Sequence, residues 1–186
     1  MPSPLDLPRH PVIHGHPVHA MLSDLPAALI PAAFLAELSC RVLGGHKRSR
    51  HAGRAISDAA TVAALAGAAA AGLTGWLDWL TMPTEHPAQK PATLHGLINT
   101  AGLLSLIGAA TLPRRRLPFL GFATAAVMVA GWIGGDLVFH HGWRVRPAEE
   151  AEIVEKDLTA AGISGYFERA RKEVSDFERR KTFLGE

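Results

Sequence analysis

The stretch at residues 59–77, AATVAALAGAAAAGLTGWL, decides the fold of this chain. It carries no charged side chain, and it lacks the polar face that recurs with a 3.6-residue period in a soluble amphipathic helix. About 20 predominantly apolar residues are needed to cross the hydrocarbon core of a bilayer. The stretch therefore predicts a transmembrane helix rather than part of a soluble helical bundle.

Three further windows, at residues 25–36, 96–112 and 117–135, also lack charged side chains. The first is the shortest, since Asp24 and Glu37 bracket it, although flanking apolar residues extend it. We therefore predict an all-α fold, a bundle of four transmembrane helices with an extramembrane amphipathic helix at the C-terminus. Ser57, a good N-cap residue, is the expected start of the second helix. The predicted helices span about 20–43, 57–80, 92–112 and 118–140.

The segments on either side of these helices differ in composition. Repeated prolines predict that residues 1–19 are extended, and no basic start precedes an apolar run there, so we expect the first helix to insert uncleaved. Residues 147–186 carry seven basic and ten acidic side chains. An apolar stripe at helical spacing predicts that this tail docks on a partner, on the membrane surface or on a second copy of the chain. The stripe consists of Phe167, Ala170, Val174 and Phe177.

The distribution of Lys and Arg predicts the orientation in the membrane. The first and third connections together hold eight basic residues: Arg41, Lys47, Arg48, Arg50, Arg54, Arg114, Arg115 and Arg116. The opposite side holds four: Arg9, Lys90, Arg144 and Arg146. Because basic residues favour the cytoplasmic side, we expect both termini to be extracytoplasmic.

Eight of the ten histidines fall at the extracytoplasmic end of the predicted helices. They are His10, His14, His16, His19, His86, His95, His140 and His141. Imidazole is a common metal and haem ligand and carries protons near neutral pH. Four crossings bring these segments to one face, so the pattern indicates a binding site there.

Three aspartates, Asp24, Asp78 and Asp136, lie at a matching depth on the first, second and fourth helices. Ionisable groups inside a membrane helix are costly and usually face the bundle interior, a partner or water. Carboxylates also orient ligating histidines by hydrogen bonding. We therefore expect a polar pocket just below the extracytoplasmic surface.

Several uses of this pocket stay open at the level of sequence. Haem b would be held across a gap between helices by His19, His95 and His141, with the three aspartates orienting them or balancing charge. A transition-metal ion would take three or four ligands from His16, His19, His86, His95 and His140, together with carboxylates. Quinone binding by a His and Asp pair is a third use. The fourth alternative is an interhelical hydrogen-bond network without a ligand.

Other chemistry is disfavoured. The chain has no His-Glu-x-x-His, Gly-x-Ser-x-Gly or phosphate-loop motif, so hydrolysis is not expected and no catalytic residue is assigned. The basic clusters follow from membrane topology, which disfavours nucleic-acid binding. The single cysteine, Cys40, is expected to be a small buried apolar residue, and no Cys-x-x-Cys-His motif for covalent haem attachment occurs.

Four motifs occur in order along the chain: His16-Pro17-Val18-His19 leading into Ser23-Asp24-Leu25-Pro26, Gly75-Trp76-Leu77-Asp78, His95, and Gly131 to Val145 (GWIGGDLVFHHGWRV). With these motifs, residues 12–146 resemble a bacterial membrane family catalogued as domain of unknown function 2231. Leu25 replaces the Phe that often precedes Pro26 in that family. The resemblance implies a four-helix membrane architecture. Related proteins in which such a domain adjoins an extracytoplasmic redox domain imply electron transfer.

We therefore expect an integral protein of the bacterial inner membrane that acts as a redox subunit rather than as an enzyme. It would bind haem b or a metal ion at the histidine-rich end and pass electrons between an extracytoplasmic redox partner, or a larger membrane complex, and the quinone pool. The alternative is a cofactor-free structural subunit that anchors a larger complex through its C-terminal helix.

Overall fold

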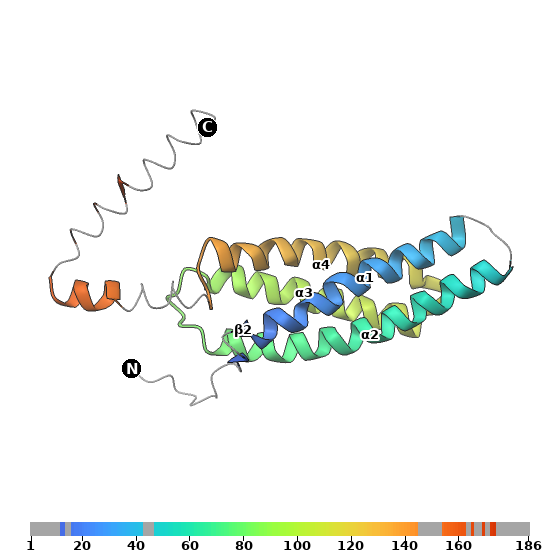
Figure 1. Cartoon of the computed structure of the whole chain (residues 1–186), viewed down its shortest axis with the longest axis horizontal. Helices are drawn as coiled ribbons and strands as arrows, with labels where there is room; N and C mark the ends of the chain where they lie inside the picture. The colour runs from blue at the N-terminus through green and yellow to red at the C-terminus, as the bar shows by residue number, and fades with distance from the viewer. Residues whose placement is uncertain are drawn as a thin grey trace. The chain divides into compact units, whose positions relative to one another are not determined.

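The computed structural model describes residues 12–13, 16–42, 47–144 and 154–162, and single residues at 165, 169, 172 and 173. Four long helices form the unit that ends at His141 (Figure 1). They are α1 (Val18–Val42), α2 (Lys47–Leu80), α3 (Gln89–Thr111) and α4 (Arg116–Phe139), with a 3-10 turn η1 (Pro113–Arg115) before α4. Each is long and apolar enough to cross a membrane. The predicted all-α class with four membrane helices is confirmed.

The helices form two antiparallel hairpins packed side by side (Figure 1). α1 packs most extensively on α2 and α3 on α4, while α1 also contacts α4 and α2 contacts α3. The starts of α1 and α3 therefore lie with the ends of α2 and α4, at what we call the histidine end. The opposite end, where α1 ends and α4 begins at Arg116, is called the arginine end.

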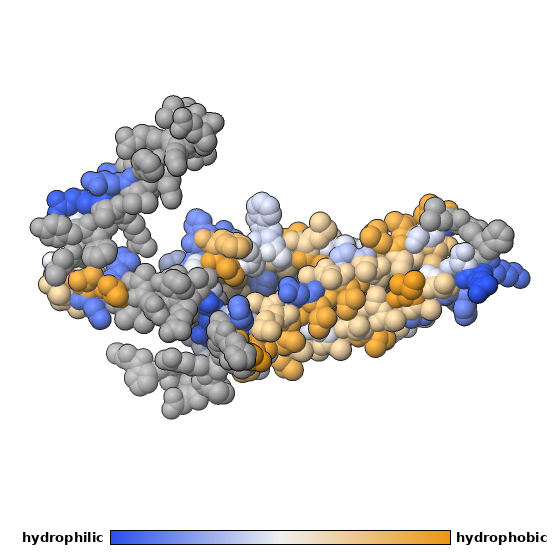
Figure 2. Space-filling view, in the orientation of Figure 1, coloured by the Kyte–Doolittle hydropathy of each residue, from blue (hydrophilic) through white to orange (hydrophobic). Residues whose placement is uncertain are grey.

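The core between the helices is built mainly from small residues. Its fully or almost fully buried members are Ile30, Ala33, Ala64, Leu106, Ala109, Leu120 and Ala123. Small side chains let helix backbones approach closely, which is the usual means of helix association in lipid. Large apolar side chains instead cover the outside, so the middle of the bundle is mostly hydrophobic and polar residues lie toward its two ends (Figure 2).

Helix starts differ from the sequence prediction. α1 begins at Val18, directly after a two-residue strand pair, β1 (Val12–Ile13) and β2 (His16–Pro17), so the first helix starts before residue 20. α2 begins at Lys47 and not at Ser57. Ser57 is not an N-cap, because its hydroxyl lies inside the bundle and donates to the carbonyl of Ala33 at 3.0 Å.

The second unit, Gly142–Glu186, is described only in part. Within it, residues 154–160 are helical, and the Arg144 guanidinium lies 5.0 Å from the centre of the Trp143 ring. The predicted apolar stripe of the tail lies outside the described residues, as do residues 1–11 and 145–153. His10, His14, His46, Arg9 and Arg146 also lie outside them.

A side-chain hydrogen bond between α2 and α3 joins the two hairpins at the histidine end. Trp79 Nε1 on α2 donates to Thr93 Oγ1 on α3 at 2.9 Å. Trp79→Phe is expected to lower the free energy of unfolding by about 1 kcal/mol, the usual contribution of one hydrogen bond. Unfolding in detergent measures this, with Trp76→Phe as the control because the Trp76 side chain is largely exposed. Equal effects of the two substitutions would contradict the assigned role of Trp79.

Candidate functional site

His19 lies in the first turn of α1 and faces α2. Its Nδ1 is 2.8 Å from the backbone oxygen of Ala71. A carbonyl only accepts hydrogen bonds, so Nδ1 carries the proton and donates, and in the neutral ring the lone pair lies on Nε2. The ring rests on Gly75, one turn beyond Ala71, where a built Cβ atom would lie 2.6 Å from His19 Cε1.

His95 lies near the start of α3 and faces α4 in the same way. Its Nδ1 donates to the backbone oxygen of Ala130 at 2.8 Å, and its ring lies close to Gly134. The side-chain amide nitrogen of Asn99 is 3.0 Å from His95 Nε2. Because Nδ1 already carries the proton, Asn99 donates and the lone pair of Nε2 accepts.

The structure brings His19 and His95 together between the two hairpins. Their ring centroids are 6.2 Å apart and the ring planes are nearly perpendicular, at 89°. Each ring is held by a backbone carbonyl of the neighbouring helix in its own hairpin. Both imidazoles are thus fixed in tautomer and orientation by contacts within the protein.

A second polar group forms at the end of α4. Asp136 Oδ2 lies 3.6 Å from His141 Nε2, and Asp136 Oδ1 lies 4.0 Å from His140 Nδ1. The rings of His140 and His141 are 4.9 Å apart. His140 is exposed and His141 is half-buried, so this group lies at the rim of the bundle.

The remaining predicted site residues are scattered. Asp24 and His16 are exposed, whereas Asp78 is buried on α2. His86 is half-buried in the connection between α2 and α3, where its Nδ1 accepts a hydrogen bond from the backbone N–H of Ala88 at 3.0 Å. Within the described part of the chain, no three His, Cys, Asp or Glu side chains lie close enough together to hold one metal ion.

An open groove runs between α3 and α4 at the histidine end. Its lining residues are Lys90, Pro91, Leu94, Trp132, Ile133 and Asp136. The Trp132 side chain is 83% exposed. The groove therefore combines apolar walls with one ammonium and one carboxylate, a surface suited to an amphipathic molecule with a polar head group.

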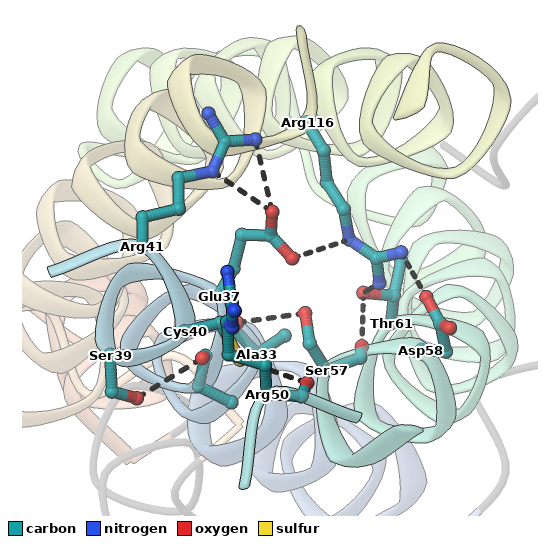
Figure 3. A network of polar contacts seen from close by, with 11 residues as sticks. Ala33, Glu37, Ser39, Cys40, Arg41, Arg50, Ser57, Asp58, Thr61 and Arg116 are labelled. Atoms are coloured by element: carbon teal, nitrogen blue, oxygen red, sulfur yellow. Dashed lines mark hydrogen bonds and ion pairs between the residues drawn. The ribbon is translucent and has the colours of Figure 1, made fainter. Parts of the chain in front are cut away.

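The arginine end contains a buried ionic network (Figure 3). Glu37 is 2% exposed and Arg116 is 6% exposed. Arg41 donates to Glu37 Oε1 from Nε at 3.1 Å and from Nη2 at 3.0 Å. Arg116 donates to Asp58 and, at 2.7 Å, to Thr61 Oγ1, while its Nε lies 3.9 Å from Glu37 Oε2. Two guanidinium groups and two carboxylates thus join α1, α2 and α4.

This network was not predicted from the sequence, because Glu37 marks the end of an apolar window there and Arg116 is one of the basic residues that indicate topology. One signal was present: Glu37 and Arg41 have the i and i+4 spacing of a helical ion pair. Cys40 is only partly buried, so the expectation of a buried cysteine is wrong, and its Sγ lies 3.6 Å from the backbone oxygen of Arg50.

Comparison with known proteins gives one family. Residues 15–147 match the family described as predicted membrane protein (DUF2231). No curated protein and no solved structure matches the chain. The match spans all four membrane helices and the histidine end, and it confirms the resemblance that the sequence motifs indicated. The chain belongs to the DUF2231 family of predicted membrane proteins.

Proposed function

We propose that this protein is a small redox subunit of the bacterial inner membrane that binds haem b, or else a metal ion, at its histidine end. It passes electrons between a docked extracytoplasmic redox partner and the quinone pool, and it makes or breaks no covalent bond itself. The fixed pair of His19 and His95 is the observation that carries this proposal.

The geometry of the pair supports a shared ligand. Two imidazoles that bind one metal atom from opposite sides have their nitrogens about 2 Å from it, which places the ring centres roughly 6 Å apart. The centroids of His19 and His95 are 6.2 Å apart. In each ring Nδ1 donates to a carbonyl, as in typical ligating histidines, so Nε2 would be the atom that holds a haem iron or a metal ion. A ligand at His95 would replace the hydrogen bond from Asn99.

The number of ligands favours haem b over a bare metal ion. A structural or catalytic metal site needs at least three protein ligands, and the described residues bring together no third His, Cys, Asp or Glu. A porphyrin supplies the equatorial nitrogens itself and needs only axial ligands from the protein. A pair of histidines therefore suits haem better than it suits a free ion.

The groove and the acidic rim support the link to quinone. Asp136 belongs both to the groove and to the group with His141. If a quinol entered between α3 and α4, its ring would contact Trp132 and its hydroxyl groups would contact Asp136. His141 and Asp136 would accept its protons, and a haem held by His19 and His95 would supply the acceptor for its electrons. Asp24 and Asp78 balance charge on α1 and α2.

The basic residues support an orientation with the histidine end outside the cytoplasm. Seven described Lys and Arg residues of the first and third connections lie at the arginine end, in the first part of α2, in η1 or at the start of α4. They are Lys47, Arg48, Arg50, Arg54, Arg114, Arg115 and Arg116. Lys90 lies at the histidine end. This asymmetry is the one that the positive-inside rule associates with a cytoplasmic arginine end.

An optical spectrum of the purified full-length protein tests the proposal. The wild type is expected to show a Soret band, and His19→Ala and His95→Ala are each expected to abolish it. His16→Ala and His86→Ala should leave the band unchanged because neither ring is part of the pair. His141→Ala should also leave it unchanged if the pair alone holds the haem.

Other outcomes separate the alternatives. If elemental analysis detects bound metal and no Soret band is present, the ligand is a metal ion and not haem. A folded, colourless and metal-free wild type would contradict the redox role and leave the cofactor-free structural subunit.

A further inference from the structure

The two hairpins carry the same short motif. It lies on the second helix of each hairpin, where that helix contacts the histidine of the first helix. α2 contains Ala71-Gly72-x-x-Gly75, and α4 contains Ala130-Gly131-x-x-Gly134. In both, the alanine carbonyl accepts the hydrogen bond from histidine Nδ1 at 2.8 Å. The second glycine of each motif lies under the same imidazole ring.

The correspondence extends over residues 57–78 of α2 and residues 116–137 of α4. The buried residues of α2 are Ser57, Thr61, Ala64, Gly67, Ala71 and Asp78. The buried residues of α4 are Arg116, Leu120, Ala123, Ala126, Ala130 and Leu137. Successive members are separated by the same intervals in both helices, so every buried position of one helix has a counterpart in the other.

α1 and α3 correspond at most of their buried positions when His19 is aligned with His95, the exceptions being Glu37 and Ser105. Pro26, Ile30 and Ala33 then align with Gly102, Leu106 and Ala109, and all six are buried. Contacts between hairpins are also balanced, since α1 packs on α4 to the same extent as α2 packs on α3. These relations describe a two-fold pseudosymmetry that exchanges the hairpins.

We propose that this chain is a tandem repeat of one helical hairpin and that its ligand lies on the pseudo-two-fold axis, where each repeat contributes one equivalent imidazole. His19 and His95 are then symmetric ligands of a single haem or metal ion. Gly75 and Gly134 are positioning residues that let the rings reach the helix carbonyls. This inference rests on the proposed function and adds the number, position and symmetry of the site.

The glycines of the two motifs differ in what surrounds them. A Cβ atom at Gly75 would lie 2.6 Å from His19 Cε1, and one at Gly134 would lie 3.0 Å from His95 Cε1. A Cβ atom at Gly72 or at Gly131 would meet nothing within 4 Å. Alanine at the second glycine therefore displaces the ring and weakens its Nδ1 hydrogen bond, whereas alanine at the first does not.

The test measures ligand content and spectrum in the full-length protein purified from the same host. Gly75→Ala and Gly134→Ala are expected to weaken ligand binding about 10- to 100-fold, as the loss of an orienting contact does. Both should also shift the Soret maximum or the reduction potential of the remaining ligand in the same direction. Gly72→Ala and Gly131→Ala are the matched controls and should behave as the wild type. Since alanine favours helix by about 1 kcal/mol over glycine, a loss cannot come from helix propensity.

A second pair of variants covers the case in which the glycine variants fail to fold. His19→Ala and His95→Ala should reduce ligand content equally, and the double variant should lose no more than either single variant. The symmetric site would be overturned if ligand content fell unequally within the glycine pair or within the histidine pair, or if the control variants lost as much ligand as the glycine variants. A ligand bound to the wild type would still support the redox subunit in that case. A wild type without any ligand would overturn both.

Discussion

Arg116→Met is expected to lower the free energy of unfolding by about 3 kcal/mol, because it leaves Glu37 buried without one of its two cationic partners. Glu37 is 2% exposed, and its Oε2 has no hydrogen-bond donor among the described residues. Breaking a buried ion pair typically costs 3 to 5 kcal/mol. We expect the lower end of that range, since Arg41 still donates to Glu37 Oε1. Unfolding in detergent measures the change.

A double-mutant cycle identifies the cause. Glu37→Met alone should cost less, because Arg116 still donates to Asp58 and Thr61, and the double variant should recover part of the loss caused by Arg116→Met. Arg114→Met is the control, since Arg114 is exposed in η1 and should change stability by less than about 0.5 kcal/mol. A small effect of Arg116→Met, similar to that of Arg114→Met, would mean that the network behaves as a solvated surface ion pair.

The four membrane helices could be predicted because crossing a bilayer leaves a strong signal in sequence. Each span must carry about 20 apolar residues, and this requirement does not depend on how the helices pack. Helix starts were harder to predict, since they depend on tertiary contacts. Ser57 has the chemistry of an N-cap, but its hydroxyl bonds to Ala33 of another helix, and α2 continues back to Lys47.

The site could be predicted only in part. Alternating helix directions place histidines of different segments at one end, and this follows from topology alone. Which of these histidines meet depends on the face that each helix turns toward the bundle interior. Because apolar residues occupy both the inner and the lipid-facing sides of these helices, the sequence gives little indication of the inner face. The structure pairs His19 with His95 and leaves His16 exposed and His86 in a connection.

The repeat is also hidden at the level of sequence. Apart from the Ala-Gly-x-x-Gly motif, counterparts differ in chemistry, as Ser57 and Arg116 or Thr61 and Leu120 show. What the two hairpins share is the pattern of burial, which appears only once the helices are packed. Such differences between counterparts have a structural role. Arg116 occupies the position that Ser57 holds in the other repeat, and its side chain forms the ionic network of the arginine end.

Leu106→Ala is expected to lower the free energy of unfolding by about 3 kcal/mol, the usual cost of a large-to-small change in a packed core. Leu106 is 0% exposed and belongs to the cluster that includes Ile30 and Leu120. The neighbouring helices cannot close the cavity completely, because the surrounding small residues already bring the backbones into contact.

Leu104→Ala is the matched control for this prediction, since it removes the same atoms from the same helix. Leu104 is 64% exposed and faces outward, where lipid or detergent chains fill the space that the side chain leaves. Its substitution should change stability by less than about 0.5 kcal/mol. Both variants lower the hydropathy of α3 equally, so an effect of membrane insertion would appear in both, and only a packing effect separates them. Equal destabilisation would therefore show that α3 turns a different face toward the core.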